Sequence, residues 1–101
     1  MSDAYQTILE TENVRVRIMT LQSGSATAWH YHGEVRDSIF CLEGPLAVEY
    51  RNPEERIELG NGQHCAVAVG RKHRVVNLAG RETSYLLVQG VGRYDFNVVE
   101  E

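Results

Sequence analysis

Apolar and polar residues alternate along most of this chain with a period of two, which favours β-strands over helices. Residues 14–19, VRVRIM, place the β-branched side chains on one face and the arginines and methionine on the other. Residues 74–76 and 85–89 alternate in the same way, and β-branched and aromatic side chains favour strands. No segment carries the apolar stripe of an amphipathic helix. The pattern predicts an all-β chain of about eight to ten short strands.

Turn-forming residues separate these segments at short intervals, as in antiparallel hairpins. Gly44-Pro45 and Gly60-Asn61-Gly62 are two such signals, and NPEE at residues 52–55 predicts a hairpin tip between LAVEY and RIEL. Short antiparallel strands with regular turns are typical of a small sandwich or barrel. Closure of the sheet would protect its edges and leave an interior that can hold a site.

The length of 101 residues is enough for one domain with a modest core, so we predict a single domain over residues 1–101. A formal net charge of −4 argues against nucleic acid or an anionic membrane as the main partner. The N-terminus, MSDAYQTILETE, lacks the features of a secretion signal, and no apolar run approaches the roughly 20 residues that span a bilayer. We therefore expect a cytoplasmic protein in which Cys41 and Cys65 are reduced and buried.

Two of the four histidines, His30 and His32, are one residue apart. In a strand, residues two apart point to the same face, so both imidazoles would aim in one direction. Neutral imidazole binds Zn, Cu, Fe and Ni, which makes the pair a candidate metal site; the alternative is two exposed or hydrogen-bonded histidines. His73 opens a later strand, and it would complete a face of three imidazoles if the two strands are neighbours.

The segments 24–44 and 62–77 resemble the two conserved motifs of the cupins, small proteins built as a double-stranded β-helix. The first segment contains, at the spacing of the first cupin motif, Gly24, His30-Tyr31-His32, Asp37 and Gly44. The second contains, at the spacing of the second motif, Gly62, Ala68-Val69-Gly70, His73 and Asn77. The resemblance implies a jelly-roll-like cupin barrel of short antiparallel strands, with the flanking residues supplying further strands.

The resemblance also implies a ligand set for one divalent metal: His30, His32, Asp37 and His73. The metal would be Fe, Mn, Ni, Cu, Co or Zn, since nitrogen-rich ligation admits all of them. The sequence departs from the family pattern at Ala68, where the motif has proline, and at Asp37, where it has glutamate. The shorter carboxylate leaves three alternatives open: direct ligation, action through a water or on an imidazole, and no metal role.

A metal held by four protein ligands keeps positions open for a substrate. The resemblance thus implies a metal-dependent enzyme of dioxygenase, isomerase or lyase type, acting on a small polar substrate that coordinates the metal. The alternative is a non-catalytic module that binds or senses a small molecule. Tyr85 and Gln89 share the face of a late strand and are candidate substrate-binding residues. Arg15 and Arg17 are expected to be solvated, or one of them reaches the pocket mouth and holds a carboxylate.

Finally, small cupins often pair through their sheets, and a domain of this size gains stability by burying surface against a copy of itself. We therefore expect a homodimer.

Overall fold

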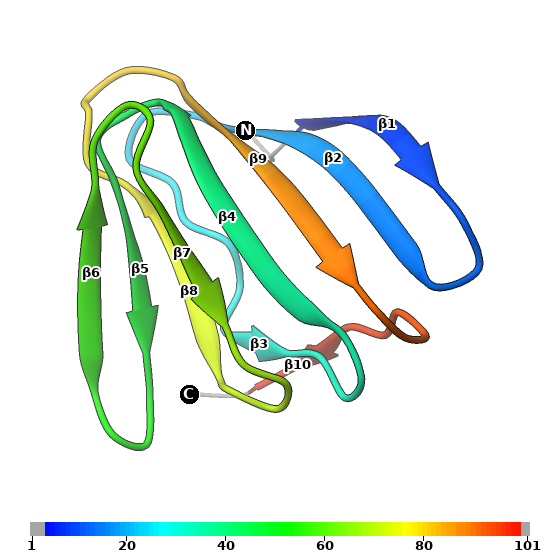
Figure 1. Cartoon of the computed structure of the whole chain (residues 1–101). Coiled ribbons are helices and arrows are strands. Elements are labelled where there is room, and N and C mark those ends of the chain that lie inside the picture. The colour runs from blue at the N-terminus through cyan, green and yellow to red at the C-terminus, as the bar shows by residue number, and fades with distance from the viewer. Residues whose placement is uncertain (1–3, 100–101) are drawn as a thin grey trace.

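A computed structural model describes residues 4–99, and this part of the chain consists of strands and loops without a helix (Figure 1). The strands are β1 (Ala4–Glu10), β2 (Val14–Leu21), β3 (His30–Tyr31), β4 (Arg36–Glu43), β5 (Leu46–Tyr50), β6 (Glu55–Leu59), β7 (His64–Val67), β8 (His73–Asn77), β9 (Thr83–Gly90) and β10 (Asn97–Val98). The predicted all-β fold of short strands is confirmed.

The strands form two antiparallel sheets of five strands each, which face each other across the core (Figure 1). One sheet has the order β1-β2-β9-β4-β7 and the other the order β10-β3-β8-β5-β6. Several neighbours in a sheet are distant in sequence, as where β9 lies between β2 and β4. The predicted hairpin is present, because β5 and β6 pair from Tyr50 and Glu55 at the tip to Leu46 and Leu59.

The core lies between the sheets and is formed by the inward-facing residue of every second position. Its buried members are Leu21, Ile39, Cys41, Leu46, Val48, Tyr50, Leu59, Val67, Val75, Tyr85 and Leu87. Burying a side chain of this size contributes roughly 1.5–3 kcal/mol, so these contacts hold the sheets together. Cys41 is buried within the cluster and Cys65 is half-buried against it, and both thiols are free, as predicted.

The inner face of β9 changes from apolar to polar along its length, which separates the core from a polar end. Tyr85 and Leu87 belong to the core, whereas Gln89 lies two residues further on the same face. In the sheet register, Gln89 is opposite Arg15 of β2 on one side and Asp37 of β4 on the other. Three polar side chains therefore form a row across the inner face, at the end of the space between the sheets.

The glycines of the two motifs have backbone and packing roles. Gly24 and Gly62 have φ angles of +75° and +82°, which strain any residue that carries a Cβ. Gly44, which ends the first motif, is required for close packing, because a Cβ there would lie 2.6 Å from the sulfur of Cys41. These glycines thus allow the turns and the close packing, while other residues carry the chemistry.

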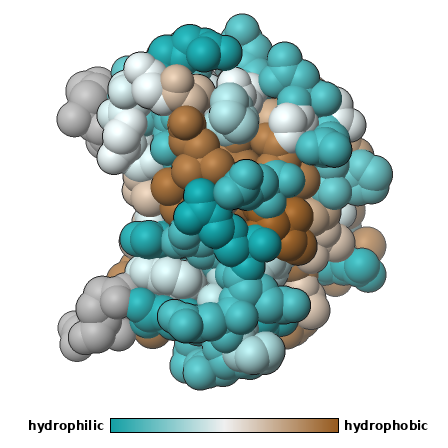
Figure 2. Space-filling model, turned by 90° about the vertical axis from the view of Figure 1, so that its left-hand side faces the viewer, coloured by the Kyte–Doolittle hydropathy of each residue, from teal (hydrophilic) through white to brown (hydrophobic). Residues whose placement is uncertain are grey.

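Figure 2 shows the side of the molecule on which β6 lies in Figure 1, with apolar residues gathered in the middle of that side between hydrophilic ones. An exposed apolar area of this kind can pack against another chain.

The homodimer, the cytoplasmic location and the single domain over 1–101 stay predictions, and residues 1–3 and 100–101 lie outside the described part. Residues 4–99 include no helix that is long and apolar enough to cross a membrane.

Candidate metal centre

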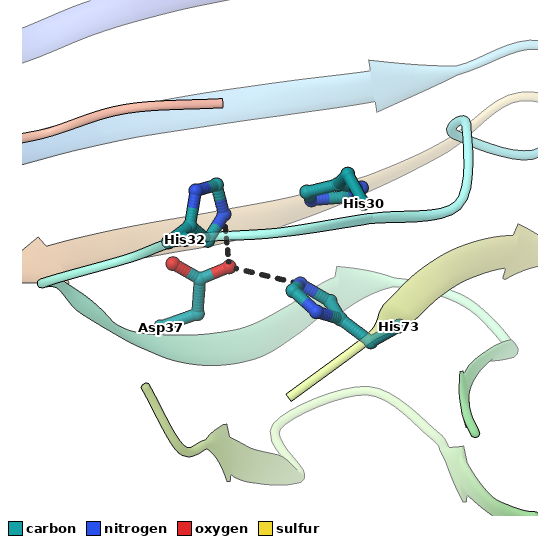
Figure 3. A group of neighbouring side chains, drawn as sticks. All are labelled: His30, His32, Asp37 and His73. Atoms are coloured by element: carbon teal, nitrogen blue, oxygen red, sulfur yellow. Dashed lines mark hydrogen bonds and ion pairs between the residues drawn. The ribbon is translucent and has the colours of Figure 1, made fainter. Parts of the chain in front are cut away.

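The four predicted ligands meet at the polar end of the space between the sheets (Figure 3). His30 lies in β3 and is paired with His73, the first residue of β8, while His32 follows directly after β3. Asp37 comes from β4 of the facing sheet. All four are buried, with exposed fractions between 1% and 6%. The two motifs thus supply one cluster that bridges both sheets.

Each imidazole is oriented by a backbone carbonyl. The Nδ1 atoms of the three rings lie 2.7–2.8 Å from the carbonyl oxygens of Ala28 (to His30), Asp95 (to His32) and Arg71 (to His73). A carbonyl oxygen only accepts hydrogen bonds, so this network assigns the proton of a neutral ring to Nδ1. The Nε2 atom then keeps its lone pair, and the hydrogen bond fixes the ring as it does around bound metals.

The carboxylate of Asp37 lies against two of these rings. Its Oδ2 atom is 3.2 Å from Nε2 of His32 and 3.2 Å from Nε2 of His73 (Figure 3). Lone pairs on Nε2 and on a carboxylate oxygen repel each other, so the arrangement needs a proton or a cation between them. The buried cluster therefore fits a positive ion by the chemistry of its donor atoms.

The spacing of the donor atoms also fits one metal ion. Two ligands at about 2.0–2.2 Å from the same ion lie roughly 3.0–3.5 Å apart when they are adjacent in its coordination shell. The two 3.2 Å separations at Asp37 fall in this range. One donor atom from each of the four residues lies within 4.8 Å of all the others. Two ligands on opposite sides of an ion are about 4.2 Å apart. A pair of donor atoms that lies further apart than this therefore needs only a small side-chain movement to bind the same ion.

Gln89 holds the second oxygen of Asp37. Its Nε2 donates to Asp37 Oδ1 at 3.0 Å, and its Oε1 accepts from Nε and Nη2 of Arg15 at 3.1 and 2.9 Å. The orientation of the amide is defined, because a guanidinium only donates and a carboxylate only accepts. Gln89, predicted as a substrate-binding residue, thus contacts Asp37 directly. It occupies Oδ1 and leaves Oδ2 directed at the imidazoles.

Burial and hydrogen bonding shift the protonation of these groups in different directions. Burial lowers the pKa of His30 to about 4, so this ring is neutral at pH 7. Burial opposes the charged forms of Asp37 and His32, but their hydrogen bond outweighs it. Together with the contact between His73 and Asp37, it lowers the pKa of Asp37, and the pKa of His32 is raised. Without a metal, a proton therefore favours the position between His32 and Asp37.

Metal binding is expected to release this proton. The raised pKa of His32 means that the metal-free protein holds the proton more tightly than a free imidazole, whose pKa is about 6.5. A metal must displace the proton, so its apparent affinity should fall as the pH decreases through the pKa of His32. Calorimetric titration in buffers of different ionisation enthalpy measures the release, and we expect up to about one proton per metal near pH 7.

Replacing Gln89 with leucine is expected to weaken metal binding by about 10- to 100-fold, the usual effect of losing a group that orients a ligand. The substitution removes the donor to Asp37 Oδ1, and the carboxylate can then rotate. The matched control is Thr83→Val in the same strand: Thr83 Oγ1 is buried without a hydrogen-bond partner among the described residues. Metal titration should leave Thr83→Val unchanged, and an equally unchanged Gln89→Leu would contradict the role of Gln89.

A cavity of about 180 Å³ adjoins the four residues. Besides them, it is lined by Arg15, Arg17, Met19, Thr27, Ala28, Ile39, Val75, Tyr85, Leu87, Gln89, Tyr94 and Phe96. Tyr94 and Phe96 are partly exposed, and the ring of Phe96 stacks on His30 with 4.5 Å between the ring centroids. The cavity therefore gives a small molecule room beside the cluster.

The other predicted site residues differ in their surroundings. Tyr85 lines the cavity but is only 2% exposed and packs in the core, and its contact with a substrate stays a prediction. Arg15 and Arg17 are half-buried and both line the cavity, which agrees with the alternative that one of them reaches the pocket and not with simple solvation. The sequence feature that indicates their place in the cavity lining is their position on the same strand face as Met19 and Leu21.

Residues 94–96 carry no sequence pattern that points to chemistry, yet they complete the site. The carbonyl of Asp95 orients His32, and the two aromatic rings on either side of it line the cavity. The carboxylate of Asp95 also accepts from the backbone N–H of Gly33 at 2.7 Å, which ties this segment to the first motif. A backbone carbonyl leaves no mark on the side-chain pattern, so no sequence signal reveals its role.

A family model described as the Cupin domain matches residues 17–89, which include both motifs and Gln89. No curated protein matches the chain. Among solved structures, a conserved protein with a double-stranded β-helix domain from Klebsiella pneumoniae has a TM-score of 0.85 at 20% identity, covering 98% of this chain and 85% of that one.

Two further solved structures are enzymes by their names. The polyketide cyclase RemF from Streptomyces resistomycificus has a TM-score of 0.82 at 18% identity, covering 98% of this chain and 72% of that one. An oxalate oxidase has a TM-score of 0.83 at 14% identity, covering 96% of this chain and 55% of that one. At these identities the likeness is one of fold: two antiparallel sheets arranged as a double-stranded β-helix.

Proposed function

The chain belongs to the cupin family, and we propose that it is a metal-dependent enzyme whose single divalent transition metal is held by His30, His32, Asp37 and His73. The observation that carries the proposal is the convergence of these four buried donors beside a cavity. We propose that Asp37 is a direct ligand through Oδ2, since this atom is as close to the imidazoles as two ligands of one ion are. Fe, Mn, Ni, Cu, Co and Zn all suit such a donor set.

A divalent metal held by these residues would supply Lewis acidity toward a coordinated oxygen of a substrate. The protein's own contacts orient the four ligand side chains. Backbone carbonyls fix the three rings, and Gln89 together with Arg15 fixes the carboxylate. Ile39, Leu87 and the aromatic rings at 94–96 give the cavity apolar walls, which limit water around a bound molecule.

The cavity offers few groups that could transfer a proton. Cys41 is buried in the core, and burial raises the pKa of its thiol, so it stays protonated. Asp37 is engaged by three side chains. We therefore propose a reaction in which the coordinated metal carries most of the chemistry, of dioxygenase, isomerase or lyase type, on a small polar substrate that coordinates it.

The alternative is a cupin that binds or senses a small molecule without turnover, and the scarcity of proton-transfer groups favours it. The enzyme proposal gains support from similarly folded proteins named as a cyclase and an oxidase. The test incubates metal-loaded protein, in air and without oxygen, with a panel of small oxygen-bearing molecules and follows products by mass spectrometry. More than one product per chain, lost in His73→Ala, supports an enzyme. Saturable binding without product supports the alternative.

A further inference from the structure

We infer that the molecule which occupies the cavity carries a carboxylate that binds to the guanidinium of Arg17, with Arg15 beside it, while another part of the molecule faces the metal centre. This inference rests on the proposed function for the metal-facing end and names the substrate class.

The cavity is cationic although the chain is acidic. Among the described residues, Asp37 is the only acidic side chain that lines it, against two arginines, while the chain has a formal net charge of −4. Asp37 already accepts from Gln89 and lies against two imidazoles. A bound divalent metal would add further positive charge. The cavity therefore favours an anion over a neutral or cationic molecule.

Arg17 has the free donors that an anion needs. Its Nε donates to Thr7 at 3.1 Å, and its guanidinium lies over the ring of Tyr5, 3.9 Å from the centroid. These contacts hold the group in place, and its terminal nitrogens make no ion pair with a described residue. Arg15 is fixed similarly, by Gln89 and by the ring of Tyr94 at 3.4 Å. Both guanidiniums are thus oriented before any ligand binds.

The register of the sheet separates Arg17 from the metal ligands. Arg15, Gln89 and Asp37 share one row, whereas Arg17 lies opposite Leu87 in the next row, and Leu87 lies opposite Ile39. Successive inward residues of a strand are about 6.6–6.8 Å apart. A molecule that reaches from the metal centre to Arg17 would pass over this apolar row. We therefore expect a short carbon chain with a carboxylate at one end and metal-binding oxygen atoms at the other.

A carboxylate fits this place better than a phosphate. The two terminal nitrogens of a guanidinium match the two oxygens of a carboxylate. Phosphate sites commonly add backbone N–H groups at helix N-termini. The described residues contain no helix, and no lysine lines the cavity. The volume of about 180 Å³ also suits a molecule of only a few carbon atoms.

The test uses short 2-hydroxy and 2-oxo dicarboxylates. Each is compared with its half-amide, in which a neutral amide replaces the distal carboxylate. Calorimetric titrations of wild-type protein, loaded with a metal confirmed by elemental analysis, should show about 10- to 100-fold tighter binding of the dicarboxylate. Arg17→Gln should reduce this preference to below about threefold. Arg36→Gln is the matched control, since Arg36 is exposed on β4 and lies outside the cavity lining. Melting curves establish that both variants fold.

The outcomes separate this inference from the proposed function. Equal binding of half-amide and dicarboxylate, an unchanged preference in Arg17→Gln, or no binding of any dicarboxylate overturns the inference, even when the protein holds its metal. Tighter binding of a phosphate monoester of the same length overturns the choice of carboxylate. The same titrations after treatment with a chelator provide the second arm. If wild-type protein takes up no metal but Arg17 still selects the dicarboxylate, the inference stands and the metal-dependent function fails.

Discussion

Replacing His73 with alanine is expected to lower the affinity for a divalent metal by more than about 100-fold. Losing a group that only orients a ligand costs about 10- to 100-fold, and loss of a ligand should exceed this. His73 is 1% exposed, and no further His, Cys, Asp or Glu side chain among the described residues belongs to the cluster. Titration with Zn²⁺ or Co²⁺ in the presence of a competing chelator measures the change.

The control for His73→Ala is His64→Ala. His64 is exposed and stacks on Phe40 with 5.0 Å between the ring centroids, and it is not part of the cluster. Its loss should leave the metal affinity within about twofold, on the usual scale of surface substitutions. Melting curves recorded with chelator distinguish loss of metal from loss of fold. Equal affinities of wild-type protein and folded His73→Ala would show that the metal binds elsewhere.

Replacing Asp37 with asparagine is expected to remove metal binding while preserving the fold. The amide oxygen of asparagine can accept from Gln89, as Oδ1 of Asp37 does. Its NH₂ group would then face Nε2 of His32 and His73, to which it can donate. The metal-free variant therefore keeps its hydrogen bonds, but a donor occupies the place of the metal-binding oxygen. Metal affinity should fall by more than about 100-fold, and the variant should keep a cooperative melting transition in chelator.

The same substitution distinguishes the three roles that the sequence leaves open for Asp37. A loss of only about 10- to 100-fold would indicate action through water or on an imidazole. An unchanged affinity would exclude any metal role. Asp37→Glu restores the usual residue of the motif and is expected to stay within about tenfold of wild type, because the carboxylate remains. The absorption spectrum of the Co²⁺-loaded proteins reports whether the ligand set changes.

Much of the fold and the cluster could be predicted from local pattern. Alternation along the chain gives the strands, and it places His30 and His32 on one face. The spacing of the second motif adds His73, and the first motif adds Asp37. These inferences hold because a strand fixes side-chain direction within a few residues, and the comparisons confirm the family to which the spacings point.

The contacts around the cluster could not be predicted, because they depend on the register of strands that are distant in sequence. Gln89 meets Asp37 across 52 positions, and Arg15 meets Gln89 across 74. A register shifted by one residue would turn Gln89 out of the space between the sheets. For Arg15 and Arg17 the sequence leaves both solvation and a place at the pocket open, and the position of β2 beside β9 brings them to the cavity.

The most direct test of the central claim is elemental analysis of the protein purified without a histidine tag and without chelators. If His30, His32, Asp37 and His73 form a metal centre, the protein should contain, or take up on reconstitution, about one divalent transition metal ion per chain. Protein that holds no such metal as purified, and binds none stoichiometrically after exposure to Fe²⁺, Mn²⁺, Ni²⁺, Cu²⁺, Co²⁺ and Zn²⁺, would contradict the account.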